Sequence, residues 1–266
     1  MTAEEIRVRL RDRGIENYAL ETEILIEEIC GRMSEDEDYS SRELAMAVEK
    51  RCERYPLQYI IGKWWLARCE FFVDESCLVP RPDTETIVEL AVKLLPRGAS
   101  FADLCTGSGC IAISVLDMRS DLCADGVELY PATLDMAKKN AAHNKVEERF
   151  CPIRGDVLDE TVLGEKKYSA IISNPPYIRT DVIETLEKEA KTEPRVALDG
   201  GEDGLIFYRA IVKNFAKNLI DGGFFLFEIG YDQADDLRKI ALENGFSCEI
   251  YKDLGGCDRA ALLRRN

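Results

Sequence analysis

From about residue 80 onward, short apolar runs that suit strands alternate with longer amphipathic runs that suit helices. Regular alternation of this kind builds an open, doubly wound, mostly parallel sheet, and it predicts the α/β fold class. The predicted strands cover residues 100–104, 126–129, 151–153, 169–173, 223–229, 246–251 and 260–263. The predicted helices cover residues 87–95, 111–118, 134–143, 205–218 and 232–244.

Residues 1–57 predict a small helical domain instead. Apolar residues recur there at roughly helical spacing, with breaks near Gly14 and Gly31. Ser41 suits the N-cap of a further helix, which Pro56 is expected to end. The content of acidic residues exceeds that of basic ones in this region, so it does not resemble a basic nucleic-acid arm.

A β-hairpin linker is predicted over residues 58–79, because residues 59–65 and 69–73 are rich in aromatic and β-branched side chains. The alternating α/β domain then occupies residues 80–266. Within the helical domain, residues 34–38 predict an acidic loop.

Composition excludes several classes of protein. The chain has 266 residues, of which 46% are apolar, and no apolar run approaches membrane-spanning length. The charged first ten residues lack the core of a signal peptide, so we expect a cytoplasmic protein with no membrane partner. The net charge of −15 argues against a protein whose main task is binding a nucleic-acid backbone. The ten cysteines include no Cys-x-x-Cys pair and are expected to be reduced, and the single histidine, His143, excludes a histidine-based triad or a multi-histidine metal site.

The apolar strand at residues 169–173 runs directly into Asn174-Pro175-Pro176-Tyr177. Proline fixes φ, lacks an N–H and keeps the residue before it extended, so these four residues predict a rigid turn. The turn offers one amide side chain, backbone carbonyls and one aromatic ring. That set suits a planar, weakly nucleophilic NH₂ group, such as a carboxamide or the amino group of a base. An ordinary proline-rich turn is the alternative for these four residues alone.

Small or acidic residues follow three successive predicted strands, at the edge where parallel sheets bind ligands. A glycine-rich turn lets the backbone approach a ligand, Glu128 can accept both hydroxyls of a ribose, and Asp156 can accept an amino hydrogen of an adenine. Taken singly, each carboxylate could be an ordinary surface residue. No glycine is spaced for a pyrophosphate and no Gly-Lys-Ser/Thr for a triphosphate, so a nucleoside without phosphates, such as S-adenosylmethionine (SAM), fits best. The predicted cofactor-binding residues are Cys105, Thr106, Gly107, Ser108, Gly109, Glu128, Asp156, Val157 and Asn174.

Together these motifs resemble the class I SAM-dependent methyltransferases and, over nearly the whole chain, the HemK family of peptide chain release factor glutamine methyltransferases. The runs that carry the resemblance are Leu78-Val79-Pro80-Arg81-Pro82-Asp83-Thr84-Glu85, Asn174-Pro175-Pro176-Tyr177, Glu193-Pro194-Arg195-Val196-Ala197-Leu198-Asp199-Gly200-Gly201, Asp203-Gly204-Leu205, Glu228-Ile229-Gly230 and Lys252-Asp253-Leu254-Gly255-Gly256-Cys257-Asp258-Arg259. Two departures stand out, because Cys105 replaces a glycine and Glu128 an aspartate of many relatives.

The resemblance implies a Rossmann-like sheet with an antiparallel last strand. It also implies SAM as methyl donor, S-adenosylhomocysteine as product and no metal. The implied substrate is the glutamine of the Gly-Gly-Gln motif in class 1 translation release factors, methylated on its side-chain amide nitrogen. The helical domain is implied to help hold the release factor, and we expect a monomer.

For the chemistry, we expect Asn174 Oδ1 and the Pro175 carbonyl to accept the two amide N–H bonds and to aim the nitrogen at the methyl group. Tyr177 is expected to pack on the amide plane, and Pro176 to lock the turn. These four residues are the predicted substrate-binding set, with Asn174, Pro175 and Tyr177 catalytic. No general base is needed before transfer, because an N-alkylated amide cation loses its proton readily to water.

Two other functions remain open on the sequence. The first is a nucleic-acid methyltransferase acting on an adenine or guanine amino group through the same turn, against which the −15 charge stands. The second is a binding protein that retains the fold without the chemistry. A segment over residues 178–201 also has two readings, because Glu184, Glu187, Glu189 and Lys191 suit either a solvated helix face or a lid that touches the substrate.

Overall fold

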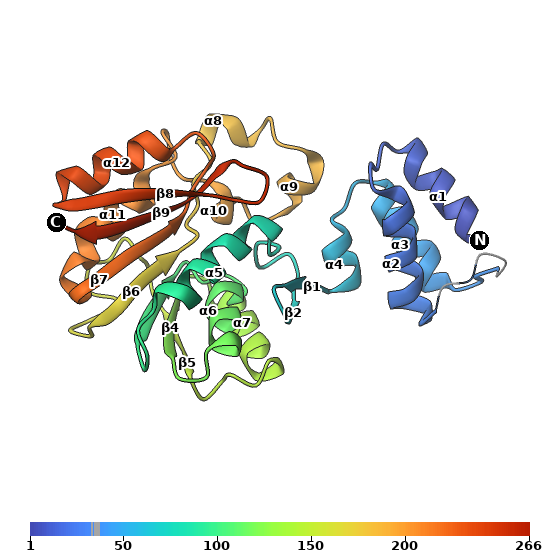
Figure 1. Cartoon of the computed structure of the whole chain (residues 1–266). Coiled ribbons are helices and arrows are strands. Elements are labelled where there is room, and N and C mark those ends of the chain that lie inside the picture. The colour runs from blue at the N-terminus through green and yellow to red at the C-terminus, as the bar shows by residue number, and fades with distance from the viewer. Residues whose placement is uncertain (33, 35–37) are drawn as a thin grey trace.

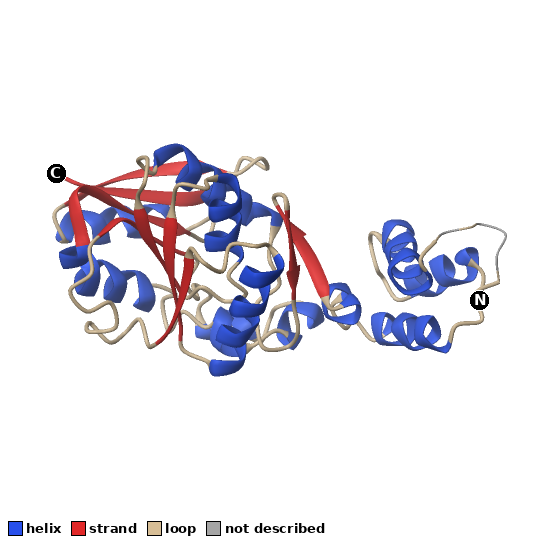
Figure 2. Cartoon of the chain, turned by 90° about the horizontal axis from the view of Figure 1, so that it is seen from below, coloured by secondary structure: helices blue, strands red, loops and turns tan. Residues whose placement is uncertain are grey.

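The computed structural model describes residues 1–32, 34 and 38–266, which form two lobes joined by a short hairpin (Figures 1 and 2). The first lobe is a bundle of α1 (Ala3–Asp12), α2 (Tyr18–Cys30) and α3 (Arg42–Cys52), followed by the short α4 (Leu57–Ile61). The second lobe contains a seven-stranded sheet with helices on both faces. No helix in the described part of the chain is long and apolar enough to cross a membrane.

Local signals set the ends of the bundle helices. Ser41 Oγ accepts the backbone N–H of Leu44 at 3.2 Å and caps α3, as predicted. Gly31 ends α2 in the left-handed conformation, with a φ of 80°. The apolar faces of the three helices meet in one buried cluster around Ile6, Leu25 and Val48. Most of the predicted acidic loop at residues 34–38 lies outside the described residues.

The linker hairpin is shorter than predicted. β1 (Lys63–Leu66) pairs antiparallel with β2 (Cys69–Phe72), but residues 59–61 belong to helix α4 and not to the first strand. Pro56, expected to end the preceding helix, is instead the N-cap of α4, and Gly62 ends α4 with a φ of 74°. These two residues confine the chain to little more than one helical turn, and this local geometry outweighs the strand propensity of the aromatic and β-branched side chains.

The sheet of the second lobe has the strand order β5-β4-β3-β6-β7-β9-β8. Its strands are β3 (Ser100–Leu104), β4 (Cys123–Glu128), β5 (Phe150–Arg154), β6 (Tyr168–Ser173), β7 (Leu219–Glu228), β8 (Phe246–Lys252) and β9 (Asp258–Arg265). β9 runs antiparallel to both of its neighbours, and the other pairings in this sheet are parallel. The predicted doubly wound, mostly parallel sheet with an antiparallel last strand is confirmed.

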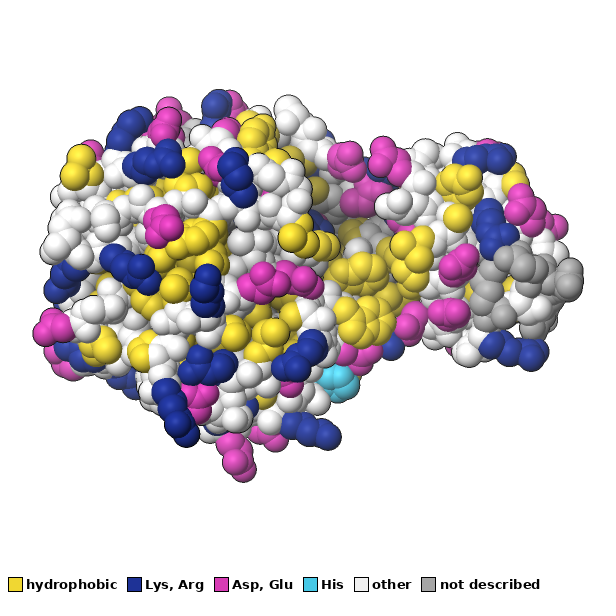
Figure 3. Space-filling view, in the orientation of Figure 1, with side chains coloured by type: hydrophobic (Ala, Val, Ile, Leu, Met, Phe, Trp, Pro, Cys, Tyr) yellow, Lys and Arg dark blue, Asp and Glu magenta, His cyan; other side chains and the backbone are white. Residues whose placement is uncertain are grey.

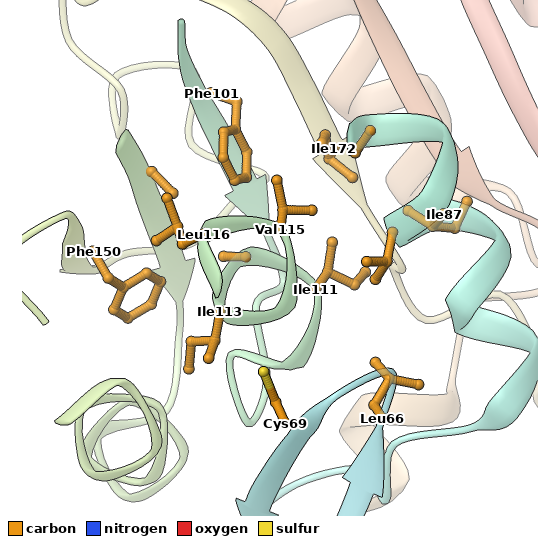
Figure 4. Packing of buried hydrophobic residues seen from close by; sticks show 14 of the residues in the cluster. Leu66, Cys69, Ile87, Phe101, Ile111, Ile113, Val115, Leu116, Phe150 and Ile172 are labelled. Carbon is orange, nitrogen blue, oxygen red and sulfur yellow. The ribbon is translucent and has the colours of Figure 1, made fainter. Parts of the chain in front are cut away.

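Helices bury both faces of this sheet (Figure 2). One face is covered by α5 (Glu85–Leu94), α6 (Cys110–Met118) and α7 (Pro131–His143), and the other by α11 (Ile206–Phe215) and α12 (Ala234–Glu243). Short 3₁₀ turns precede α5 and β7 (Pro82–Thr84 and Ala216–Asn218). Successive strand residues alternate between the two layers, so Phe101 packs with the first group of helices and Ala102 with the second. Figure 4 shows the first layer, where Val115 of α6 lies among Phe101 and Ile172 of the sheet.

Between β6 and α11 the chain forms three short helices, α8 (Thr180–Ile183), α9 (Lys188–Thr192) and α10 (Arg195–Leu198). We call residues 184–199 the strap. Glu189 of the strap forms ion pairs with Arg51 at 3.0 Å and with Arg54 at 2.7 Å, and Arg51 also binds Glu21 of α2 at 2.5 Å. The prediction of a solvated helix face is therefore wrong for Glu189, because this carboxylate fastens the strap to the helical lobe.

Candidate active site

A cleft of about 360 Å³ lies at the carboxyl ends of β3, β4 and β6, the edge at which open α/β sheets bind ligands. The linker that follows β2 and the last residues of the strap form its opposite wall. Most of the predicted site residues line this cleft, namely Cys105, Thr106, Gly107, Ser108, Glu128, Asp156, Val157, Asn174 and Pro176. The structure places Gly109, Pro175 and Tyr177 beside these residues in the chain but not in the lining of the cleft.

The glycine-rich turn after β3 forms the floor of the cleft. Gly109 precedes α6 with a φ of 83°, a conformation that favours glycine, and a Cβ on it would lie 2.6 Å from Ile113 Cδ1. The buried Asp103 carboxylate holds the turn from below, where its Oδ2 accepts the Thr106 hydroxyl at 2.6 Å and the Ala112 N–H at 3.3 Å. Burial raises the pKa of Asp103 to about 7, although both hydrogen bonds oppose this rise.

Glu128 ends β4 and turns both carboxylate oxygens toward backbone donors. Its Oε2 accepts the N–H of Gly107 and its Oε1 the N–H of Tyr130, each at 3.1 Å. Only 9% of the residue is exposed, and burial raises the pKa of its carboxyl while these backbone bonds oppose the rise. Each oxygen retains a free lone pair that a ligand hydroxyl can use.

Asp156 and Val157 follow β5 at the far end of the cleft. Asp156 Oδ1 accepts the backbone N–H of Leu158 at 2.8 Å, which closes a tight turn and leaves the other oxygen for a ligand. Gly155 before it has no room for a side chain, because a Cβ there would lie 2.1 Å from Val162 Cγ2. Val157 is buried in the apolar layer beneath.

The turn after β6 places Asn174 and Pro176 in the cleft, while Pro175 is buried behind them. Its backbone is clamped from outside by two glycines of the following segment. A Cβ on Gly200 would lie 2.7 Å from Tyr177 Cα, and a Cβ on Gly204 would lie 2.4 Å from the Tyr177 carbonyl oxygen. The side chain of Gln233 also donates to that carbonyl at 3.1 Å. The turn is therefore rigid for packing reasons as well as for its prolines.

Tyr177 packs against the core layer formed with α11 and α12. Burial raises the pKa of its phenol to about 12. Its expected place on the plane of a substrate amide stays a prediction, because the ring is not part of the cleft lining.

From the sequence, residues 178–201 suited either a solvated helix face or a lid, and the structure places the end of this segment in the wall of the cleft. The buried Glu193 carboxylate forms an ion pair with Arg81 and accepts the Val79 N–H at 3.1 Å, so it pins the strap to the linker. The strap residues that line the cleft are Pro194, Val196, Ala197 and Asp199. Two of the runs that carry the family resemblance, residues 78–85 and 193–201, contribute to this wall.

Three cysteines line the cleft, namely Cys77, Cys105 and Cys110. Burial raises the pKa of Cys77 to about 12, and it raises the pKa of the other two thiols well above the ordinary value. Thiolates are the reactive form of cysteine, so these side chains are apolar lining at neutral pH and not nucleophiles.

Two family models match the chain in the order of its lobes. Residues 3–62 match the PrmC N-terminal domain, and residues 84–196 match the methyltransferase small domain. A solved methyltransferase structure from Pyrococcus furiosus has a TM-score of 0.55 at 16% identity and covers 73% of this chain and 87% of that chain. At that identity the likeness shows the fold alone.

Curated relatives are similar over almost the full length. The release factor glutamine methyltransferase of Geobacter sulfurreducens is 37% identical over 261 residues, covering 94% of this chain and 90% of the relative. The release factor glutamine methyltransferase of Thermodesulfovibrio yellowstonii is 38% identical over 225 residues, covering 82% and 80%. With this similarity across both lobes and a methyltransferase fold around the cleft, the chain belongs to the release factor glutamine methyltransferase family.

Proposed function

We propose that this protein transfers a methyl group from SAM to the side-chain amide nitrogen of the glutamine in the Gly-Gly-Gln motif of class 1 release factors. One observation supports this most directly. The Asn174 turn, suited to an amide NH₂, lines the same cleft as the glycine-rich turn and Glu128, which suit a nucleoside. Donor and acceptor would therefore meet in a single enclosed space.

The residues present fit a SAM molecule. Glu128 has one free lone pair on each oxygen for the two ribose hydroxyls, and Asp156 has one uncommitted oxygen for the adenine amino group. Ser108 Oγ is buried in the cleft wall and has no hydrogen-bond partner among the described residues, so it can meet a polar group of the ligand. When bound, SAM supplies a methyl group already activated by its sulfonium.

The chain's own contribution is positioning. An amide nitrogen is a poor nucleophile because its lone pair is delocalised into the carbonyl. Asn174 Oδ1 and the Pro175 carbonyl would accept the two N–H bonds, hold the nitrogen toward the methyl group and stabilise the positive charge that develops on it. No backbone N–H among the described residues bonds the Pro175 carbonyl, although Pro175 does not line the cleft.

The helical lobe is the proposed second contact for the release factor. The strap joins that lobe to the wall of the cleft through Arg51, Glu189 and Glu193. On the face seen in Figure 3, basic side chains are interspersed with acidic ones, an arrangement that suits a protein partner better than a nucleic-acid backbone. We place the reaction in the cytoplasm, with the enzyme acting as a monomer.

Methyl transfer from labelled SAM to purified, unmethylated release factor tests this function. We expect one methyl group on the Gly-Gly-Gln peptide, located on the glutamine amide by fragmentation mass spectrometry. A release factor with the motif glutamine changed to glutamate is the matched control and should stay unlabelled. Parallel reactions with total RNA and DNA test the rival function, and label on nucleic acid with none on release factor would overturn the proposal.

A further inference from the structure

Glu228 is the last residue of β7 and lies beside the Asn174 turn. Ser173 of β6 pairs with Phe227 of β7 in parallel register, so Asn174 and Glu228 follow as neighbours at the strand ends. Only 1% of Glu228 is exposed, and its Oε2 has no hydrogen-bond partner among the described residues. A buried carboxylate with an unused oxygen costs stability, which calls for a functional explanation.

Burial raises the pKa of this carboxyl group, and the nearby side chains of Thr84 and Asn174 oppose the rise. When it is ionised, this carboxylate can only accept hydrogen bonds, so Asn174 can bond it only through its Nδ2–H. The amide is planar, and its Oδ1 is therefore turned away from Glu228. In this orientation Oδ1 is free to accept a bond from a substrate NH₂.

Reversal of the Asn174 amide would remove this function. The amide oxygen would then face Glu228, and Nδ2, which only donates, would face the substrate NH₂, which also donates. Two donors in contact repel each other. Fixing the orientation of the amide therefore matters more for substrate binding here than it would at a solvent-exposed asparagine.

We propose that Glu228 is the positioning residue that fixes the Asn174 amide with its oxygen toward the substrate. This inference rests on the proposed function, because it assigns a partner to the residue that would hold the glutamine. Only the ionised carboxylate enforces the orientation, since a protonated one can donate to Oδ1 and permit the reversed amide.

Several charged or titratable groups face Glu228. Burial raises its pKa to about 7, Asp83 raises it further, and Arg259 lowers it. Tyr177, Tyr208 and Cys110 are coupled to it and stay neutral in this range, because the pKa of each is itself raised. Asp103 also has a pKa of about 7, so two carboxyl groups contribute to pH dependence near the cleft.

Glu228→Gln tests the inference, because it keeps the shape of the side chain and removes its charge. We expect kcat to fall by about 10- to 100-fold, the range expected for loss of a charge-assisted hydrogen bond. SAM affinity, measured by calorimetry, and the KM for release factor should stay unchanged. In the wild type, kcat should rise as the pH increases through about 7. The part of this rise that comes from ionisation of Glu228 should be absent in Glu228→Gln and present in Glu228→Asp.

A double-mutant cycle separates positioning from a general effect. In an Asn174→Ala background, Glu228→Gln should have no further effect on kcat, because its only route is through Asn174. Asn218→Ala is the stability control, since Asn218 is also buried with an unpartnered oxygen but precedes β7 at the opposite end of the sheet. It should lower the melting temperature without altering the pH profile.

A Glu228→Gln enzyme with normal kcat and an unaltered pH profile, while the wild type methylates release factor, would overturn the inference alone. Additive effects in the double mutant would overturn it as well. A wild-type enzyme that does not methylate the release factor glutamine would instead overturn the proposed function.

Discussion

The two halves of the cleft differ in how their main carboxylate and amide side chains are held. In the cofactor half, at the ends of β3, β4 and β5, Glu128 and Asp156 are tied to backbone N–H groups at 2.8–3.1 Å. In the transfer half, at the ends of β6 and β7, no backbone N–H in the described part of the chain bonds the Asn174 amide or the Glu228 carboxylate, and Glu228 keeps an unpartnered oxygen.

This difference matches the two tasks of a group-transfer enzyme. Groups already oriented by the backbone can hold a ligand in its ground state at little further cost. Groups with unused hydrogen-bonding capacity can strengthen their interactions as charge develops on the reacting nitrogen, and only such interactions raise kcat. We therefore expect changes in the cofactor half to alter affinity and changes in the transfer half to alter turnover.

The largest effect should come from Asn174→Ala. We expect kcat to fall by about 10²–10³-fold, the usual loss for one preorganised hydrogen bond, and SAM affinity to fall far less. Single-turnover methylation and calorimetry measure the two quantities separately. Asn144→Ala is a matched control, because Asn144 Nδ2 bonds the Glu70 carbonyl at 2.9 Å outside the cleft. Near-normal turnover in Asn174→Ala would remove the transfer half from the mechanism.

Each half also contains an almost fully buried carboxyl group that should make stability depend on pH, Asp103 in the cofactor half and Glu228 in the transfer half. Asp103 and Glu228 have pKa values of about 7 in the folded protein, above their values in the unfolded chain. Between those values the folded state binds more protons, so the free energy of unfolding should decrease as pH rises from about 5 to about 7 and then level off.

Urea unfolding of the apo protein across this pH range measures the effect. Asp103→Asn and Glu228→Gln should each remove part of the slope, the first from the cofactor half and the second from the transfer half. A free energy of unfolding that increases with pH through this window would contradict the burial of both groups.

Glu128→Ala should show the opposite kinetic signature to Asn174→Ala. Loss of both ribose contacts should weaken SAM binding by about 10- to 100-fold, whereas kcat at saturating SAM should largely recover. Calorimetry with SAM checks the affinity, and Glu249→Ala on β8 provides an acidic control outside the cleft. Unchanged affinity would exclude Glu128 from the cofactor site.

The smallest effect concerns Cys105, which stands where many relatives have glycine. This residue has a φ of 57° in the glycine-rich turn after β3. A β-branched residue is strained in this conformation, whereas glycine adopts it freely. We expect Cys105→Val to be less stable than Cys105→Gly by about 1–2 kcal/mol, measured by thermal unfolding. Equal stability of the two variants would show that the turn relaxes in solution.

The sequence could predict those features that depend on local pattern. The alternation of strand and helix patterns after residue 80 predicted the sheet, and the two prolines after β6 predicted the turn that presents Asn174. Residues 59–61 were misassigned because one short turn between Pro56 and Gly62 outweighed their strand propensity.

Contacts between distant segments could not be predicted in this way. Glu189 meets Arg51 across 138 positions of sequence, and Glu193 meets Arg81 across 112. Nothing in the local pattern of an acidic, helix-forming segment distinguishes these carboxylates from solvated ones. The pairing of Glu228 with Asn174 likewise follows from the register of β6 and β7, which only the folded sheet reveals.

The attachment of the strap to Arg51 means that the helical lobe is not an appendage that can be trimmed. A fragment beginning at the sheet lobe would leave Glu189 without its guanidinium partners and the wall of the pocket without its outer anchor. Removing one member of a largely buried ion pair costs more than the intact pair contributes. Such a fragment could fold its sheet and bind nucleoside, yet offer the incoming glutamine a misplaced wall.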